Sequence, residues 1–113
     1  MKILVADDSD EFRAEVLDTL QAFGHTTVGV RNGGEAIVEA LTEKFDLVLT
    51  DCNMPKLRGY QVIKAIKKEK PSVRIIMMSS DVTALMEKVA VKLGAEAVVQ
   101  KMFIPEALKK FGV

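Results

Sequence analysis

The chain has 113 residues, a length typical of one domain that can bury a hydrophobic core without disulfides or metal ions. Its 16 basic and 16 acidic residues cancel, so the net charge gives no reason to expect a nucleic acid or a membrane surface as partner. A single cysteine, Cys52, excludes an internal disulfide, and no apolar run is long enough to span a membrane or to form the core of a signal peptide. These features predict one soluble, cytoplasmic domain over residues 1–113.

Two hydrophobic periodicities alternate along the chain. Continuous runs of β-favouring residues predict strands at 2–6, 26–30, 45–51, 73–78 and 97–100. Apolar residues at helical spacing predict helices from Ser9 or Asp10 to Gly24, at 35–44, between Gly59 and Pro71, at 83–93 and at 105–111. This alternation is typical of an α/β fold, in which right-handed crossovers cover both faces of a doubly wound, five-stranded parallel sheet.

The apolar positions of the predicted helices indicate which side of each helix packs on the sheet. The inward residues are expected to be Phe12, Val16, Leu17, Leu20 and Phe23 in the first helix, Ala36, Ile37, Ala40 and Leu41 in the second, Val62, Ile63 and Ile66 in the third, and Leu85, Met86, Val89 and Leu93 in the fourth.

Polar side chains stand where four of the five predicted strands end. The first strand ends at Asp7 and Asp8, the third at Asp51, the fourth at Ser79 and the fifth at Lys101. The carboxyl ends of parallel strands meet at one edge of a sheet, so these side chains are expected to converge in one crevice. In the flavodoxin-like strand order 2-1-3-4-5, the first and third strands are neighbours, which brings the three carboxylates together.

Three clustered carboxylates need a counter-charge to remain ionised. A hard divalent cation with oxygen ligands, typically Mg²⁺, supplies that charge. The alternative is a purely structural role, in which the acids cap helices and Lys101 pairs with one of them.

Together these residues resemble the receiver domain of two-component response regulators, whose best-known single-domain form is the chemotaxis receiver. The resemblance covers essentially the whole chain. It depends on Asp7-Asp8 after the first strand, Asp51 followed by Met54-Pro55 and Gly59, Ser79 after the fourth strand, Gly94-Ala95, and Lys101-Met102-Phe103 where the family has Lys-Pro-Phe.

The resemblance implies a phosphorylation-dependent signalling switch and not an enzyme, apart from self-phosphorylation from a phosphodonor and slow autodephosphorylation. It implies that Asp51 accepts a phosphoryl group from a histidine kinase or a phosphotransfer protein. Ser79 and Lys101 would bind phosphoryl oxygens.

The same resemblance implies a Mg²⁺ site formed by Asp8 directly, Asp7 through water, Asp51, and the backbone carbonyl of Asn53. It also implies that a downstream protein docks on the surface of the fourth helix, fifth strand and fifth helix, around Val98.

Three features depart from the family pattern. The position of the family's aromatic switch residue, three residues before the lysine, is Val98, so movement is expected in the loop after Ser79. Met102 replaces the family's proline, so we expect a trans bond between Lys101 and Met102, which would let Lys101 move away from the phosphoryl position. The final helix is short, which fits a minimal receiver or part of a longer regulator.

Two other functions are compatible with a strand-end aspartate. A haloacid-dehalogenase-like phosphatase also uses such a residue with Mg²⁺, but Asn53 stands where that class has its second aspartate. A pseudo-receiver, which is a protein-binding module that is never phosphorylated, is compatible with Val98 and Met102 but not suggested by the intact acids.

Overall fold

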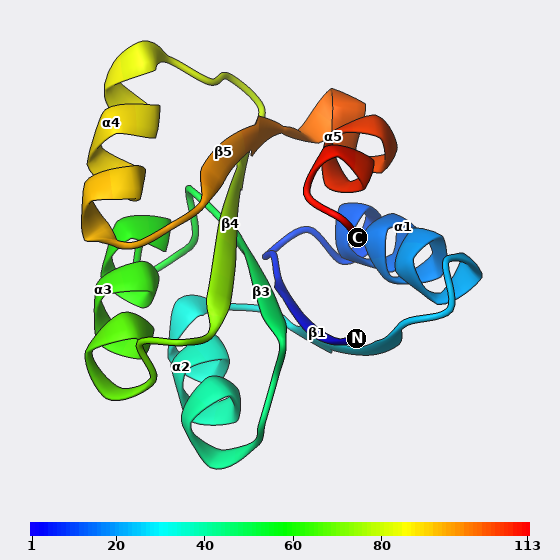
Figure 1. Ribbon diagram of the computed structural model, residues 1–113, viewed down its shortest axis with the longest axis horizontal. Coiled ribbons are helices and arrows are strands. Elements are labelled where there is room, and N and C mark those ends of the chain that lie inside the picture. The colour runs from blue at the N-terminus through cyan, green and yellow to red at the C-terminus, as the bar shows by residue number, and fades with distance from the viewer.

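Five strands form one parallel sheet in the computed structural model, which describes residues 1–113. The strands are β1 (Lys2–Ala6), β2 (Thr26–Val30), β3 (Leu47–Asp51), β4 (Arg74–Ser79) and β5 (Ala97–Gln100). Their order across the sheet is β2-β1-β3-β4-β5, and every neighbouring pair is parallel. Figure 1 labels β1, β3, β4 and β5, of which β5 lies at one edge of the sheet. The predicted flavodoxin-like α/β fold, with its strand order, is therefore confirmed.

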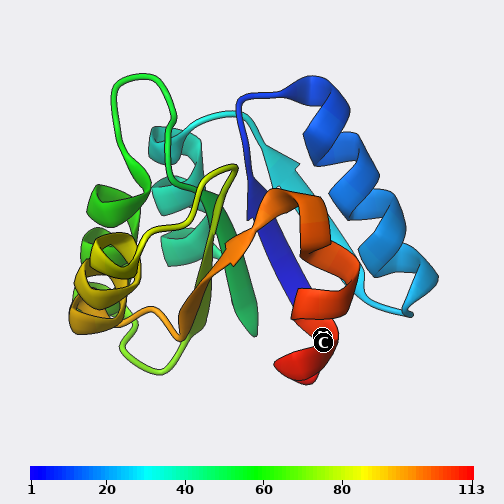
Figure 2. The same ribbon diagram turned by 90° about the horizontal axis from the view of Figure 1, so that it is seen from above.

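The helices lie in two layers, one on each face of the sheet. They are α1 (Asp10–Ala22), α2 (Gly33–Thr42), α3 (Gly59–Glu69), α4 (Ala84–Leu93) and α5 (Ile104–Lys110), and a 3₁₀ turn, η1 (Lys101–Phe103), joins β5 to α5. Figure 2 shows α1 and α5 on one face and α2, α3 and α4 on the other. None of these helices combines the length and apolar character that a membrane crossing requires.

Alternating side chains of the central strands fill both helical layers. In β4, Ile75 and Met77 point into the core beneath α2, α3 and α4, whereas Ile76 and Met78 point into the core beneath α1 and α5. All four side chains are fully buried. Burial on both faces explains why these strands read as continuous apolar runs and not as alternating ones.

Side-chain caps fix where three helices begin. Asn32 Oδ1 accepts a hydrogen bond from the Glu35 backbone N–H at 2.8 Å, so α2 begins at Gly33, two residues before the predicted start. Thr83 Oγ1 accepts from the Met86 N–H at 3.1 Å, which makes Thr83 the cap of α4 and not its first residue. In α1, the cap is Ser9.

The predicted inward face of α4 is partly wrong. Leu85 is 70% exposed and Val89 is 36% exposed, whereas Ala90 is fully buried and Met86 and Leu93 pack against the core. The true contact stripe is rotated around the helix from the predicted one, because α4 packs against both α3 and the edge strand β5.

Two further apolar residues predicted to face inward are exposed. Phe23 follows the last turn of α1, and Leu41 lies in the last turn of α2. Helical spacing continues to the end of each helix, but these ends contribute little to the two cores, so the periodicity alone overestimates the buried stripe.

Candidate functional site

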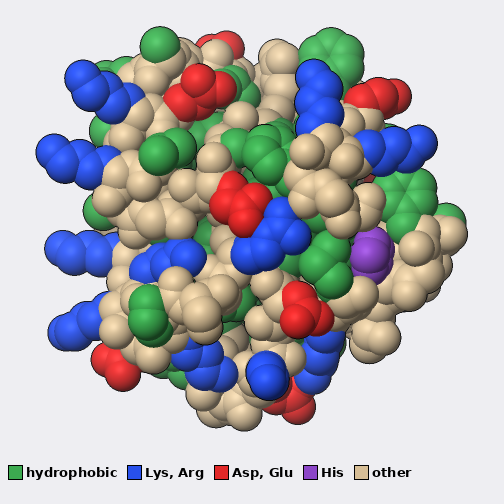
Figure 3. Space-filling view, viewed as in Figure 1, with side chains coloured by type: hydrophobic (Ala, Val, Ile, Leu, Met, Phe, Trp, Pro, Cys, Tyr) green, Lys and Arg blue, Asp and Glu red, His purple; other side chains and the backbone are tan.

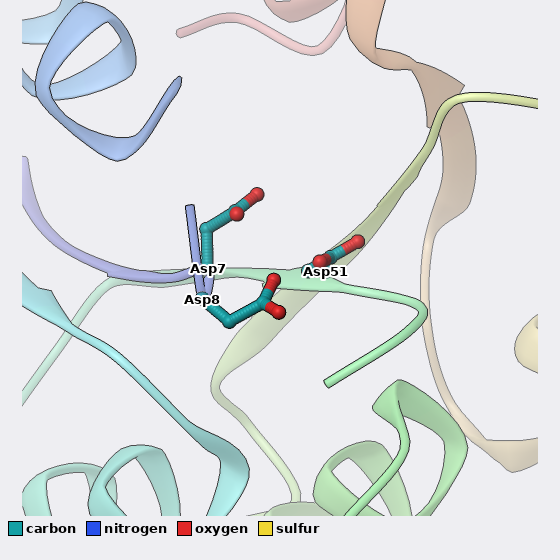
Figure 4. Close-up of side chains that lie close together, drawn as sticks. All are labelled: Asp7, Asp8 and Asp51. Atoms are coloured by element: carbon teal, nitrogen blue, oxygen red, sulfur yellow. The ribbon is translucent and has the colours of Figure 1, made fainter. Parts of the chain in front are cut away.

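The carboxyl edge of the sheet carries an acidic cluster of three residues, Asp7, Asp8 and Asp51. Asp7 follows β1 directly and Asp51 ends the neighbouring strand β3. Each residue offers a carboxylate oxygen, and these oxygens lie within 4.8 Å of one another (Figure 4). The predicted convergence of the three carboxylates is confirmed, and their environments differ, since Asp7 and Asp51 are buried and Asp8 is exposed.

Asp7 is held on three sides. Its Oδ1 accepts a hydrogen bond from the Ser9 backbone N–H at 2.9 Å, and its backbone carbonyl accepts one from Arg13 Nη1 at 2.8 Å. Its Oδ2 atom is buried and accepts no hydrogen bond. The only cation within ion-pair distance of Oδ2 is Lys101, whose Nζ lies 2.8 Å away. A buried carboxylate oxygen of this kind is well suited to bind a cation.

Lys101 reaches the acidic cluster from the start of η1. Its Nζ lies 2.8 Å from Asp7 Oδ2 and 3.2 Å from Asp51 Oδ1. All peptide bonds are trans, so the predicted trans bond between Lys101 and Met102 is confirmed. With this trans bond Lys101 lies at the site, and weaker binding of a phosphoryl group stays a prediction.

Burial and neighbouring charges change the proton affinity of these groups. Burial, followed by the charge of Asp7, raises the pKa of Asp51 from 3.8 to about 6, although Lys101 and the Asn53 N–H lower it in part. Burial alone would lower the pKa of Lys101, but its contacts with Asp7 and Asp51 outweigh burial and raise it. With all three acids ionised, one ammonium group leaves two negative charges uncompensated, which is the charge of one divalent cation.

Ser79 and Asn53 lie beside the cluster. Ser79 ends β4, which neighbours β3, but its buried hydroxyl is engaged within its own loop. There Oγ donates to the Asp81 carbonyl at 3.0 Å and accepts from the Asp81 N–H at 3.2 Å. Asn53 follows the end of β3 by two residues. Its backbone N–H donates to Asp51 Oδ1 at 3.4 Å, so the Asn53 backbone contacts the carboxylate of Asp51.

The loop after Asp51 is held closely by the backbone. The Cys52 N–H donates to the Met78 carbonyl at 2.8 Å, and the Gly59 N–H donates to the Cys52 carbonyl at 2.9 Å. A Cβ atom on Gly59 would lie 2.6 Å from the Asp51 carbonyl oxygen, so only glycine permits this approach. This contact brings the start of α3 against the end of β3.

One residue at the site was missed by the sequence analysis. Phe12 was assigned to the core-facing stripe of the first helix, and it does pack against that core. Its ring centroid also lies 4.7 Å from Lys101 Nζ. The only sequence signal for this contact is its place in the first turn of the helix that follows Asp7 and Asp8.

Comparison with known proteins agrees with this geometry. The sequence pattern of the response regulator receiver domain matches residues 3–111. A chemotaxis protein CheY homolog of Campylobacter jejuni is 32% identical over 114 residues, covering 97% of this chain and 88% of that protein.

Solved structures show the same similarity. Chemotaxis protein CheY4 of Vibrio cholerae has a TM-score of 0.89 and 30% identity, with 97% of this chain and 93% of that chain covered. Response regulator protein TrrA of Thermotoga maritima, in complex with Mg²⁺-BeF, has a TM-score of 0.88 and 29% identity, with 98% and 95% covered. Because the receiver-domain sequence pattern matches residues 3–111, this chain belongs to the family of response regulator receiver domains.

Proposed function

We propose that residues 1–113 form one receiver domain that is switched by phosphorylation of Asp51. Receiver domains are signalling modules that interact with histidine kinases or phosphotransfer proteins and with downstream targets. The observation that carries the assignment of Asp51 is its position: a buried strand-end carboxylate between two further acids and the Lys101 ammonium group. The donor would be a phosphohistidine of such a kinase or phosphotransfer protein.

Asp51 acts as the nucleophile in this proposal. Its Oδ1 atom is engaged by Lys101 at 3.2 Å and by the Asn53 N–H at 3.4 Å, which leaves Oδ2 to attack phosphorus. The phosphorus–nitrogen bond of the donor breaks as the new phosphorus–oxygen bond forms, and the electron pair stays on the histidine nitrogen. Lys101 binds a phosphoryl oxygen, and Ser79 would bind another after releasing its loop contact to Asp81.

Asp7, Asp8, Asp51 and the Asn53 carbonyl would hold Mg²⁺. The buried Oδ2 of Asp7 accepts no hydrogen bond and has only the Lys101 ammonium group as a counter-charge, and the cluster carries two uncompensated negative charges. Both features fit a hard divalent cation. When bound, the cation neutralises the carboxylates and the incoming phosphoryl oxygens. Mg²⁺ also appears in the TrrA complex, which supports the same metal here.

The output surface in this proposal is formed by α4, β5 and α5. A groove of about 470 Å³ runs between these elements, with Phe103 and Phe111 among its lining residues. Val98 also lines the groove, but it is only 5% exposed and its side chain belongs to the core beneath α2, α3 and α4. Its packing favours movement in the loop after Ser79 over movement of Val98 itself.

The test is incubation with Mg²⁺ and acetyl phosphate, followed by intact-mass spectrometry. The native chain should gain one phosphoryl group, and Asp51→Asn should gain none. Asp46→Asn is the matched control, because Asp46 is an exposed acid just before the same strand and should leave the adduct unchanged. An equal yield in Asp51→Asn would refute the assignment of Asp51, and no adduct in the native chain would favour the pseudo-receiver.

A further inference from the structure

Phe12 and Lys101 form a cation–π pair at the acidic site. Lys101 Nζ lies 4.7 Å from the centroid of the half-buried Phe12 ring, which belongs to the first turn of α1. We propose that Phe12 is a positioning residue, whose ring holds the Lys101 ammonium group at the acidic cluster. The inference concerns the reaction of the proposed function and in that respect rests on it.

Lys101 needs such support because its own segment is loosely anchored. It begins η1, a turn of three residues in which none is buried, and the next residue, Met102, is 79% exposed. The first buried residue after Lys101 is Ile104. A lysine side chain loses much rotamer freedom when it is fixed, so a turn without core contacts would leave the ammonium group free to sample other positions.

The carboxylates alone are not a constant anchor for Lys101. Asp7 and Asp51 attract its ammonium group, but in the proposed function both acids also take part in cation binding, and Asp51 becomes phosphorylated. The attraction between an ammonium group and an aromatic face comes from the ring quadrupole, so it persists when the charges of the acids change. Phe12 therefore supplies the part of the contact that does not depend on the state of the site.

The Phe12 ring is itself fixed relative to Asp7. The Phe12 N–H donates to Ser9 Oγ at 3.2 Å, and the Ser9 N–H donates to Asp7 Oδ1 at 2.9 Å. Arg13, the next residue, donates from Nη1 to the Asp7 carbonyl at 2.8 Å. The first turn of α1 is thus tied to the strand end that carries the acid, so the ring and the Asp7 carboxylate keep a constant geometry toward Lys101.

The experiment compares Phe12→Leu, which keeps an apolar side chain but removes the ring, with Phe12→Tyr, which keeps the ring. Phe23→Leu is the matched control, because Phe23 caps the other end of α1 and its ring centroid lies 5.6 Å from Lys109 Nζ, outside the acidic cluster. All variants are first compared by thermal melting, so that a loss of folding is recognised separately.

The direct readout is the NMR signal of the Lys101 ε-methylene group. In the native chain the Phe12 ring current should shift this signal upfield. Phe12→Leu should abolish the shift and increase the mobility of the methylene group, whereas Phe12→Tyr and Phe23→Leu should preserve both native values. An unchanged Lys101 signal and mobility in Phe12→Leu would overturn the proposal.

The second readout is the rate of adduct formation with Mg²⁺ and acetyl phosphate. Phe12→Leu should react about three- to tenfold more slowly, which lies within the range for loss of one partly buried cation–π contact. Phe12→Tyr and the control Phe23→Leu should both react at the native rate. If Phe12→Leu reacts at the native rate, the Phe12 ring has only a structural role, and the proposed role in positioning Lys101 is overturned. If the native chain forms no adduct, the proposed function fails, and the Lys101 signal alone decides whether Phe12 positions it.

Discussion

At the scale of single residues, the proposed phosphorylation site Asp51 lowers the stability of the folded protein when its carboxyl group is ionised. Burial and the nearby Asp7 raise its pKa to about 6, and Lys101 offsets only part of that effect. In an unfolded chain the same carboxyl group is free of both influences and keeps its ordinary pKa of 3.8. The folded state therefore binds this proton more tightly than the unfolded state.

Asp51→Asn should stabilise the metal-free protein in a pH-dependent way. The folded pKa is raised, so the unfavourable contribution of Asp51 is absent below about pH 4, grows as the pH rises, and is complete above about pH 6. A shift of this size corresponds to roughly 2–3 kcal/mol at neutral pH. Urea unfolding of both proteins at pH 4 and pH 7.5, without divalent cations, measures the difference.

The matched control is Asp18→Asn, since Asp18 is an exposed acid of α1 outside the acidic cluster and its substitution should not stabilise the protein as Asp51→Asn does. A stability gain for Asp51→Asn that is equally large at pH 4 and pH 7.5 would contradict the raised pKa. A loss of stability at pH 7.5 would show that the ion pair with Lys101 outweighs burial.

At the scale of elements, the connection from β3 to α3 is set by one close backbone contact. A Cβ atom on Gly59 would lie 2.6 Å from the Asp51 carbonyl oxygen and 2.9 Å from Met77 Sδ. Neither the backbone at the proposed phosphorylation site nor the fully buried Met77 can move without disturbing its neighbours. The loop therefore transmits the position of Asp51 to the start of α3.

Gly59→Ala should destabilise the protein by about 1–3 kcal/mol, the range for added volume in a packed interior. The matched control is Gly34→Ala in the first turn of α2, where the nearest atom to a Cβ would be Asn32 Oδ1 at 3.4 Å. That change should be neutral or stabilising by up to about 1 kcal/mol, because alanine loses less backbone entropy on folding. Denaturant unfolding tests both, and equal effects of the two substitutions would contradict the steric argument.

The loop between β4 and α4 is the element expected to move on phosphorylation. Ser79 Oγ both donates to and accepts from the backbone of Asp81, so recruitment of this hydroxyl to a phosphoryl oxygen must break loop contacts. We expect backbone displacement from Ser80 to Ala84 with Val98 unmoved. Amide and methyl NMR spectra with and without beryllofluoride and Mg²⁺ measure this, and a rotamer change at Val98 as the dominant response would refute it.

At the scale of the whole molecule, the net charge of zero conceals an uneven distribution of charge along the chain. Residues 1–43 hold nine acidic and three basic residues, whereas residues 44–113 hold seven acidic and thirteen basic residues. Lysine and arginine side chains project from the side of the molecule formed by α3 and α4 (Figure 3). The balanced composition therefore does not mean that partners meet an electrically uniform surface.

Mg²⁺ should stabilise the whole fold, because it relieves repulsion among the three acids in the native state only. At ten times its dissociation constant, the added free energy of unfolding is about 1.4 kcal/mol. Asp8→Ala should melt higher than the native chain without metal and respond less to Mg²⁺. Thermal melts in MgCl₂ and in NaCl of equal ionic strength measure both effects.

Asp18→Ala is the matched control, since Asp18 is an exposed acid of α1 outside the acidic cluster. It should respond to Mg²⁺ as the native chain does. If Asp8→Ala responds just as strongly and melts no higher without metal, a shared cation site at the three acids is contradicted.

The sequence by itself determined the fold class and the positions of the three acids at strand ends, whereas the strand order that brings these acids together was expected from the flavodoxin-like fold. The fold class and the strand-end positions depend on local patterns: apolar runs of strand length, helical spacing, and polar residues such as Asp51 placed where a strand ends. Parallel topology then makes residues that share the same position on their strands neighbours at one edge. No detail of side-chain packing is needed for that inference.

The tertiary structure alone decided how these groups are held. Lys101 stays at the site without the family's proline because it meets Asp7, Asp51 and the Phe12 ring, all distant from it in the chain. The contact stripe of α4 likewise depends on where the helix meets the sheet and not on its own periodicity, which is why Leu85 is exposed. Sequence periodicity records which residues are apolar, but contacts between distant segments select which of them are buried and which charges are paired.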